Sequence, residues 1–594
     1  MLLTHLSARL PDYMLPASFT FMEAIPLTLN GKVNRRALPE PVFGDRENYV
    51  APRNALETQL CAIWQAVLGL EQISIHDNFF RIGGDSIISL QLVSKLRQAG
   101  FSLQVKTIFE APTVAQLAVL LMQTASTAEI FAEQGLLNGE FALLPVQQTF
   151  FGWQLAQPHH WNQAFMIQIP SDIQIIQIEQ ALAALTERHD MLRCRFFVTK
   201  NGYRQCYSAD IPSSQPRLKH RDIRQCSQEE LHQQLTQWQS GFNYHNGPLW
   251  QAAHLTGYAD GSTRLFFAFH HLIIDAVSWR IIAEDMRLLL QGMPLPAKTS
   301  SYRQWVAAVQ QYARQHQHEV PYWKQVLAGN NSKPTLDNLI RHQLEISAEM
   351  TDILLHEANA GFHTEINDLL LSALTVALQD TFDKSVNHIL LEGHGRESID
   401  NTIDISETVG WFTTMYPVRL ENQANITDTL IHTKEMLRAV PNKGIGYGAL
   451  QQAGYLNDDL PAISFNYLGQ LGSASHQDWS ITNDDCGTMI ASENGGHSLL
   501  GINGAVQAGK LRFYVDSRLP QTKTALFTRA FEQALNHIIT TAQKQSRTGE
   551  IMTPSDYGIK GVSLEQFNQI THHFEHTNNV SSPHDSENET TLDL

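Results

Sequence analysis

The sequence has no hydrophobic segment long enough to cross a membrane, and it has few cysteines. No run of about 18 apolar residues occurs, which is the length that a spanning helix needs. The start of the chain, Met1–His5, lacks the basic-then-apolar layout of a signal peptide. The 5 cysteines are an odd, scattered set without CxxC spacing, which fits reduced thiols better than disulfide bonds. These absences lead us to expect a cytoplasmic protein with no membrane partner.

Basic charge is also scarce. The chain has 594 residues, with 42 basic and 59 acidic side chains and a formal net charge of −17 at pH 7. Because nucleic-acid-binding proteins carry a basic patch or stripe on one face, we expect no nucleic acid partner. The length exceeds what a single hydrophobic core supports, and it predicts about three domains.

The segment Asp77–Ser86 reads DNFFRIGGDS and is the most informative part of the chain. Its two glycines free the backbone, and Ser86 then opens a helix with apolar periodicity. The apolar positions of that helix are Ile87, Ile88, Leu90, Leu92, Val93 and Leu96. Ser86 is therefore expected at a helix start, where backbone N–H groups can hold a phosphodiester.

An Asp-Ser pair is also an ordinary helix cap. With F-F-x-x-G-G-D-S intact, however, the segment resembles the phosphopantetheine attachment site of the peptidyl carrier proteins of nonribosomal peptide synthetases. This resemblance implies that a phosphopantetheinyl transferase places 4′-phosphopantetheine on Ser86. The substrate would then be a covalently held thioester, on which the rest of the chain acts.

The flanking sequence predicts a small helical bundle around this serine. Asn54 can cap one helix, and another opens after Thr113. Three to four short amphipathic helices over about 70 residues predict a four-helix carrier domain at residues 54–122. Residues 39–53, which include Pro-rich and charged sequence, and residues 123–140, which lack periodicity, are predicted linkers.

Residues 1–38 are predicted to form a small α/β piece. It ends in the turn sequence Asn30-Gly31-Lys32, which presents the lysine. This resembles the C-terminal end of a synthetase adenylation domain, although Asn34 stands where that family usually has Asp. No Gly-rich phosphate loop precedes it. We therefore expect a remnant that cannot activate an amino acid, with an adenylation core as an upstream partner.

Residues 141–576 mix strand and helix patterns, and residues 577–594 have the polar composition of a disordered tail. The apolar run at 265–269 predicts a buried strand that leads into His270 and His271. Adjacent histidines in an extended chain point to opposite faces, and no third ligand lies at metal spacing, so we expect no metal. One histidine should be structural and the other should face a cavity.

A carboxylate follows a second apolar strand. Glu392 is followed by Gly393-His394-Gly395, whose glycines would let the backbone approach a ligand closely. A carboxylate at the end of a buried strand is expected to have a raised pKa, unless Arg396 pairs with it.

These residues carry a second resemblance. H-H-x-x-x-D resembles the motif of the condensation-type superfamily, which has a two-lobed α/β fold like chloramphenicol acetyltransferase. Further segments resemble epimerization-domain motifs in the family's order, and Ala276 is a departure because Gly is common there. These segments are Glu392–Glu397, Val409–Thr413, Pro441–Gly448 and Phe465–Gly469. The resemblance implies an epimerization domain at residues 141–576, with its active site in a tunnel between two lobes and the Ser86 arm entering from one face.

Such a domain would invert the α-carbon of an L-aminoacyl or peptidyl thioester without pyridoxal phosphate, because a thioester carbonyl already acidifies the α-carbon. The resemblance implies His271 and Glu392 as the catalytic acid–base pair. We favour Glu392 as the base for the L-substrate and His271 as the donor, with the reverse assignment open. The implied supporting residues are Asp275, which holds the histidine loop, Arg396, which orients Glu392, and Asn466 and Tyr467, which line the site.

Two other functions are compatible with part of the pattern. A condensation domain shares H-H-x-x-x-D but joins two carrier-bound substrates in a peptide bond. A degenerate, non-catalytic scaffold would only dock carriers. The segments Glu392–Glu397 and Phe465–Gly469 argue against a condensation domain, and the intact His271, Asp275 and Glu392 argue against a scaffold. If the domain is an epimerase, we expect a downstream condensation domain that selects the D product.

Replacing Ser86 tests the carrier prediction. Ser86→Ala should abolish the mass gain on treatment with coenzyme A and a phosphopantetheinyl transferase, because the attachment hydroxyl is lost. Intact-protein mass spectrometry measures this gain. Modification that persists in the variant at another serine would contradict the assignment.

Overall fold

A computed structural model describes the chain in several stretches. These are residues 49–70, 72–80, 82–84, 86–101, 103, 107–108, 111–123, 130–208, 218–330, 339–471, 478–494, 498–558, 566–567 and 569. The chain divides into two compact units, Met1–Thr127 and Ala128–Leu594. The predicted adenylation remnant at 1–38 and the predicted tail at 577–594 lie outside the described residues.

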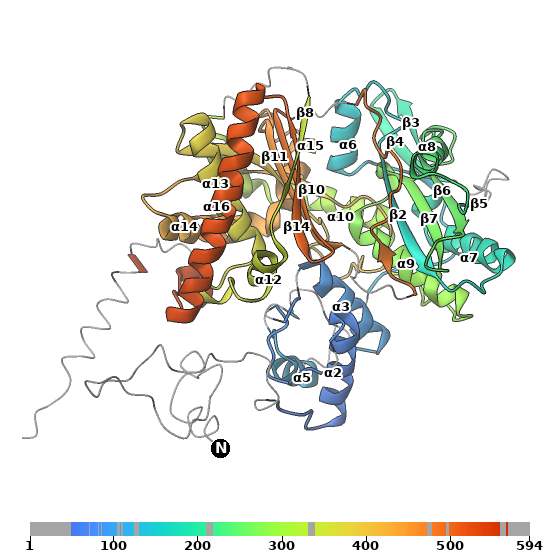
Figure 1. Cartoon of the computed structure of the whole chain (residues 1–594), viewed down its shortest axis with the longest axis horizontal. Helices are drawn as coiled ribbons and strands as arrows, with labels where there is room; N and C mark the ends of the chain where they lie inside the picture. Colours follow the sequence, from blue (N-terminus) through green and yellow to red (C-terminus); the bar gives the residue numbers. More distant parts are fainter. Residues whose placement is uncertain are drawn as a thin grey trace, which may run out of the picture. The chain divides into compact units, whose positions relative to one another are not determined.

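The described part of the first unit is helical (Figure 1). Its helices are α2 (Ala55–Leu68), α3 (Ser86–Gln98) and α5 (Val114–Gln123). The predicted cap is confirmed, because the Asn54 side chain accepts a hydrogen bond from the Glu57 backbone N–H at 2.9 Å. A small apolar core joins the helices through Leu60, Trp64, Phe79, Leu92, Val93, Leu96 and Leu117.

The Gly-Gly pair before Ser86 is required by the backbone. Gly83 has a φ of 105°, which side chains rarely adopt. A Cβ on Gly84 would lie 2.4 Å from the Phe79 ring, and the Gly84 N–H donates to the Phe79 carbonyl at 2.9 Å. The turn leads directly into α3, which begins at Ser86 and has no acidic residue in its first turn. The structure thus places Ser86 at a helix start, as the sequence predicts.

The second unit has a first half, residues 130–330, and a second half, residues 339–558. Within its described residues the strands form three sheets. The sheet of the second half has the order β10-β9-β11-β13-β14-β8. Its strands are β8 (Ile340–Glu345), β9 (Val386–Gly393), β10 (Thr414–Glu421), β11 (Ile463–Leu471), β13 (Leu500–Gln507) and β14 (Lys510–Ser517).

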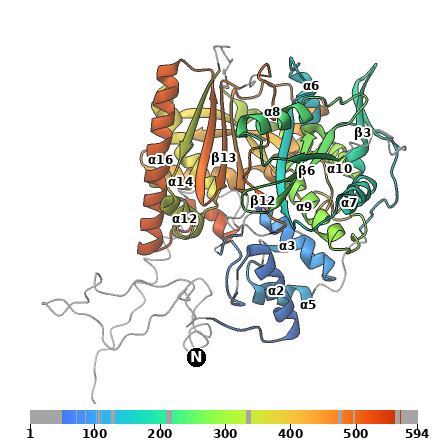
Figure 2. The ribbon, with the colours of Figure 1, turned by 45° about the vertical axis from the view of Figure 1, so that its right-hand side comes forward.

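Helices α13, α14 and α16 pack together on one face of this sheet (Figure 1), and α14 and α16 lie on the same side in the turned view (Figure 2). The helices are α12 (Ala348–His356), α13 (Ile366–Phe382), α14 (Ile426–Ala439), α15 (Ile445–Gln452) and α16 (Gln521–Thr548). Buried aliphatic and aromatic side chains of the strands, including Ile389, Leu391 and Phe513, fill the core.

The first half contains two sheets, ordered β12-β2-β7-β6-β5 and β1-β4-β3. Their strands are β1 (Gly139–Phe141), β2 (Asn162–Ile169), β3 (Cys194–Thr199), β4 (Gly202–Tyr207), β5 (Lys219–Asp222), β6 (Trp250–Thr256), β7 (Thr263–His270) and β12 (Ile481–Thr482). The helices are α6 (Pro145–Gly152), α7 (Ile175–Arg188), α8 (Gln228–Gln239), α9 (Ala276–Leu290), α10 (Tyr302–Gln315) and α11 (Val320–Leu327). The strand predicted at 265–269 is confirmed as part of β7, which is buried along its whole length.

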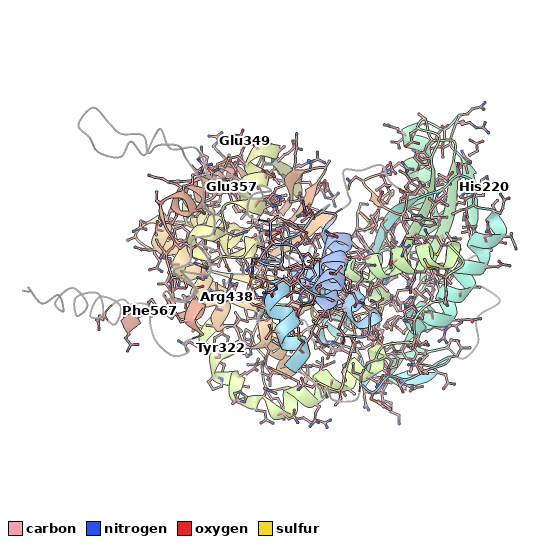
Figure 3. The ribbon with its side chains drawn as sticks, turned by 90° about the horizontal axis from the view of Figure 1, so that it is seen from below. His220, Tyr322, Glu349, Glu357, Arg438 and Phe567 are labelled. Carbon is pink, nitrogen blue, oxygen red and sulfur yellow. The ribbon has the colours of Figure 1, made fainter. Side chains whose placement is uncertain are left out.

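The two halves form the predicted two-lobed α/β fold. Figure 3 shows His220 of β5 at one side of the unit and Glu349 and Arg438 of the second half at the other. The halves are joined by β12, which belongs to the second half in sequence but pairs antiparallel with β2 through Ile481 and Thr482.

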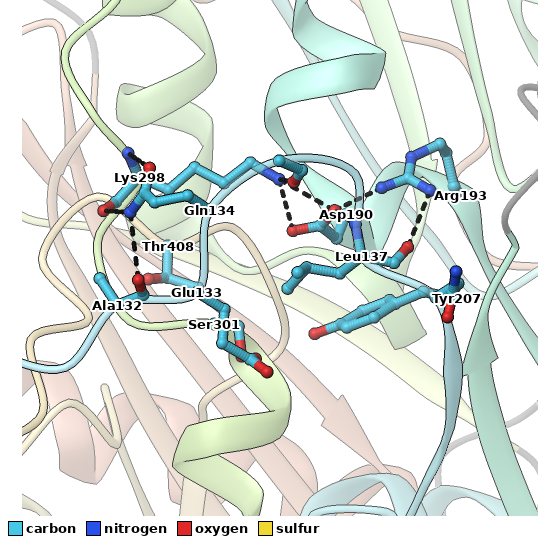
Figure 4. Close-up of polar contacts among 12 residues, drawn as sticks. Ala132, Glu133, Gln134, Leu137, Asp190, Arg193, Tyr207, Lys298, Ser301 and Thr408 are labelled. Carbon is cyan, nitrogen blue, oxygen red and sulfur yellow. Dashed lines mark hydrogen bonds and ion pairs between the residues drawn. The ribbon is translucent and has the colours of Figure 1, made fainter.

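The last part of the predicted linker at 123–140 is attached to the second unit (Figure 4). Lys298 reaches both the Asp190 carboxylate at 2.8 Å and the Gly135 carbonyl at 2.7 Å. Glu133 pairs with Arg303 at 2.6 Å. From residue 130 onward the segment is therefore held by ion pairs and hydrogen bonds, and β1 begins at Gly139.

Two further observations concern composition. All five cysteines are free thiols, and burial raises the pKa of Cys61 to about 11, which keeps that thiol protonated near neutral pH. Among the helices that the structure describes, none is both long and apolar enough to cross a lipid bilayer.

Candidate active site

The histidine pair lies where β7 ends. His270 is fully buried, its Nε2 lies 2.8 Å from the Pro158 carbonyl, and its Nδ1 accepts the Leu272 N–H at 3.2 Å. Burial lowers its pKa to about 3. Because both ring nitrogens are bonded to backbone groups, His270 is held as a neutral ring within the protein.

His271 points differently and begins a short 3₁₀ turn, His271–Ile273. Its Nδ1–H donates to the Ile274 carbonyl at 2.9 Å, and its Nε2 lies 2.8 Å from the amide nitrogen of Gln163. Its ring centroid is 4.2 Å from that of Trp411. Burial lowers the pKa of His271 to about 4, so the resting ring is neutral and carries its lone pair on Nε2.

Glu392 lies near the end of β9, opposite Met415 of β10. Strand alternation puts it on the face opposite the core residues Ile389 and Leu391. The carboxylate makes no hydrogen bond or ion pair with any residue in the described stretches of the chain. Although the side chain keeps some accessible surface, loss of hydration raises its pKa to about 7, with no charged neighbour contributing.

The structure corrects the prediction for Arg396. Its guanidinium does not orient Glu392; it donates to both oxygens of Asp275 at 3.2 and 3.3 Å. It also donates to the Ser278 hydroxyl at 3.0 Å and to the carbonyls of Ile405 and Thr408, each at 2.8 Å. The alternative in which Arg396 neutralises Glu392 is excluded by the same contacts.

Asp275 in turn gathers several donors. It caps α9 by accepting the backbone N–H and the hydroxyl of Ser278 at 2.8 and 2.7 Å. It also accepts the Phe412 N–H at 3.1 Å. With Arg396, these contacts join the loop that carries His271 to the chain that follows Glu392.

Gly395, which follows His394, was predicted to let the backbone approach a ligand, but the structure shows a different reason for a glycine there. Gly395 has a φ of 69°, and a Cβ there would lie 1.7 Å from the Phe412 carbonyl oxygen. The close approach is therefore between two segments of this chain, whereas the sequence pattern suggested an approach to a ligand. It brings the backbone after Glu392 against the Trp411–Thr414 segment.

The last two predicted residues lie on β11, which runs parallel to β9. The register pairs Ser464 with Leu390, which puts Asn466 on the same sheet face as Glu392. Alternation assigns Tyr467 to the opposite face, and the register of β11 shifts directly after it.

A hollow of about 490 Å³, partly open, lies between segments of the two halves. Its apolar lining includes Leu144, Val146, Trp305, Phe412, Met415 and Ile445. His271 and Glu392 are not in this lining. The hollow adjoins the site through Met415, the cross-strand neighbour of Glu392.

Two residues beside His271 received no role from the sequence. Trp411 belongs to a segment that the sequence analysis singled out, but its contact with the imidazole depends on the chain reversal around Gly395. For Gln163 the local signal is weak, a polar side chain on an apolar strand, because only the pairing of β2 with β7 brings it to His271. A search for polar side chains on apolar strands would have found Gln163, without identifying its partner.

The Asp275–Arg396 pair should be important for stability. Asp275→Ala leaves a buried guanidinium without its carboxylate, and we expect a loss of about 3–5 kcal/mol in the free energy of unfolding. The matched control is Asp222→Ala, which breaks the exposed pair of Asp222 with Arg224 and should leave the melting temperature nearly unchanged. Equal melting temperatures for the two variants would contradict the role given to the buried pair.

Comparison with known families agrees with this geometry. The family described as "Condensation domain" matches residues 138–557, and the family described as "Phosphopantetheine attachment site" matches residues 58–121. Bacitracin synthase 2 of Bacillus licheniformis is 35% identical over 606 residues, which cover 96% of this chain and 23% of that protein. The N-(5-amino-5-carboxypentanoyl)-L-cysteinyl-D-valine synthase of Amycolatopsis lactamdurans is 36% identical over 572 residues, which cover 92% of this chain and 15% of that protein. The chain thus spans less than a quarter of the length of these curated relatives.

Solved structures show the same fold. The epimerization domain from the third module of tyrocidine synthetase B is 31% identical, with a TM-score of 0.63, and the match covers 70% of this chain and 100% of that one. The first condensation domain of the calcium-dependent antibiotic synthetase, at 14% identity, has a TM-score of 0.54 over 69% and 97% of the two chains. Since the family match at 138–557 spans most of its length, the chain belongs to the condensation-domain family of nonribosomal peptide synthetases and carries a phosphopantetheine carrier domain ahead of that domain.

Proposed function

We propose that the second unit epimerises the α-carbon of an L-aminoacyl or peptidyl residue that is held as a thioester on Ser86, giving the D-configured thioester. The observation that carries this proposal is the state of Glu392. It is a half-buried carboxylate with no partner among the described residues and a pKa of about 7, as an acid–base catalyst near neutral pH requires. The 31% identity to a solved epimerization domain supports the same reaction.

The reaction needs two proton-transfer groups. Attached to Ser86, 4′-phosphopantetheine would present the substrate as a thioester, whose carbonyl acidifies the α-hydrogen. One protein group then removes the α-proton, and the other returns a proton to the opposite face. His271 and Glu392 are the two titratable groups proposed for these steps, and no pyridoxal phosphate or metal is needed for this scheme.

The pKa values bear on which group is the base. Between pH 4 and 7, Glu392 holds a proton and His271 does not. In this populated state His271 is ready to accept the α-proton and Glu392 to donate one, which is the reverse of the assignment favoured from the sequence. Since epimerization runs in both directions, the L- and D-substrates use the pair in opposite senses, and each direction requires one proton on the pair.

The surroundings support such chemistry. The Trp411 ring covers His271, and its Nε1–H is buried without a partner in the described part of the chain. An unpaired donor beside the site suits a reaction that develops negative charge on the substrate. Asp275 and Arg396 fix the loops that carry the two groups, and Asn466 shares the sheet face of Glu392.

The proposed function defines partners. A phosphopantetheinyl transferase would load Ser86, an adenylation core would supply the amino acid, and a downstream condensation domain would select the D product. Because the free enantiomers have equal energy, the enzyme alone should give a mixture of L and D. Peptide formation by this unit, with a second carrier-bound substrate, would instead support a condensation function.

Replacing either acid–base group tests the proposal. His271→Ala and Glu392→Gln should each lower the rate of inversion on the loaded carrier by about 10²–10⁴-fold, because each removes one proton-transfer group. Chiral analysis of the released amino acid measures inversion. The controls are His356→Ala and Glu349→Gln, which change exposed residues of α12 and should behave like wild type.

Deuterium wash-in from solvent at the α-carbon of the L-substrate separates the two roles. The variant that lacks the L-face base should lose wash-in, whereas the other variant should keep some wash-in without inversion. Near wild-type conversion by both variants, with Ser86 loading intact, would place the chemistry elsewhere.

The rate should also depend on pH in a defined way. Above about pH 7 Glu392 loses its proton and neither group can donate, and below about pH 4 His271 gains one and neither can accept. We therefore expect kcat/KM for inversion to fall on both sides of this window. Initial rates on preloaded carrier, corrected for thioester hydrolysis, measure the profile. A rate that keeps rising through pH 9 would contradict the assignment of Glu392.

A further inference from the structure

Gln163 makes direct contact with the proposed catalytic nitrogen. It lies on β2, which pairs antiparallel with β7, and the His271 N–H extends this pairing by donating to the Trp161 carbonyl at 2.9 Å. Residues two apart on a strand share a face, so Gln163 lies on the same face as His271. Its amide nitrogen is 2.8 Å from Nε2 of the imidazole.

This contact occupies the position that a substrate needs. The bond from Nδ1–H to the Ile274 carbonyl fixes the ring, which leaves one lone pair, on Nε2. The Gln163 N–H donates to that lone pair in the resting site. For His271 to exchange a proton with the α-carbon, the amide of Gln163 has to leave this position.

The amide oxygen of Gln163 does not anchor the side chain in this position. Oε1 of Gln163 is buried and has no hydrogen-bond partner in the described stretches. A substrate therefore has to break only one hydrogen bond to displace the side chain. A buried amide that has lost its partner will bond to the nearest polar group, because leaving it unpaired costs about 1–3 kcal/mol.

The substrate brings such a group with it. The carbonyl oxygen of a thioester is carried by the carbon next to the α-carbon, so it arrives beside the displaced amide when the α-hydrogen arrives at Nε2. On proton removal the electron pair of the C–H bond moves toward this oxygen and the proton goes to Nε2. A hydrogen-bond donor at that oxygen stabilises the transition state more than the ground state.

We infer that Gln163 is a further catalytic residue, whose amide N–H holds the place of the α-hydrogen at His271 and then donates to the thioester carbonyl oxygen. This inference rests on the proposed epimerization. It adds to the Trp411 N–H a second donor for the developing negative charge, from a residue in the first half of the unit that contacts His271 itself.

Two substitutions of similar size test it in the whole chain, loaded on Ser86. Gln163→Met removes the donor, and Gln163→Glu replaces it with a carboxylate that accepts only. Both should lower kcat for inversion by about 10²–10³-fold while KM stays near wild type, because the lost interaction belongs to the transition state. Gln343→Met, which changes an exposed glutamine of β8, is the matched control.

The outcomes separate this inference from the function on which it rests. Loss of kcat in either Gln163 variant, with melting temperature and Ser86 loading unchanged, supports the inference; if one variant does not fold, the other decides. Wild-type kcat in a folded variant overturns it. If both Gln163 variants lose kcat and also melt at a clearly lower temperature than wild type, the residue has a structural role, and the inference is overturned. Absence of inversion by the wild-type chain would instead reject the proposed function.

Discussion

The buried ion pair between Asp275 and Arg396 is the constraint on which the rest of the site depends. Asp275 lies four residues after His271, and Arg396 lies four residues after Glu392. Pairing them fixes the two loops against each other, although the groups that would do chemistry do not touch. A buried ion pair is costly to desolvate, and here main-chain donors and the Ser278 hydroxyl offset that cost. The main contribution of this ion pair is to fix the positions of the loops that carry His271 and Glu392.

The same burial shifts the two proposed catalytic groups in opposite directions. Low hydration disfavours the charged form of each, so it raises the pKa of Glu392 and lowers that of His271. Pairs of titratable groups whose surroundings separate their pKa values often serve as an acid and a base. These pKa shifts need no charged neighbour. Arg396 can therefore pair with Asp275 without disturbing the pKa of Glu392.

Local features were predictable from sequence, and long-range ones were not. Asn54, the helix start at Ser86 and the strand before His270 follow from caps and periodicity, which act within a few residues. The partner of Arg396 was mispredicted because its nearness to Glu392 in sequence suggested a pair, whereas the chain turns at Gly395 and carries the guanidinium away. The contact of Gln163 with His271 depends on the register between two strands about 100 residues apart, which periodicity does not encode.

The crossing strand β12 has a consequence for how the unit can be divided. It is only two residues long, yet together with backbone bonds from Trp479, Ser480 and Met489 it lies along the outer side of β2, which is otherwise the edge of the sheet in the first half. An uncovered edge strand with apolar faces is a template for pairing with other chains. A first half produced alone would expose the eight-residue β2 and should self-associate, so the two lobes are separable in shape but not as independent folding units.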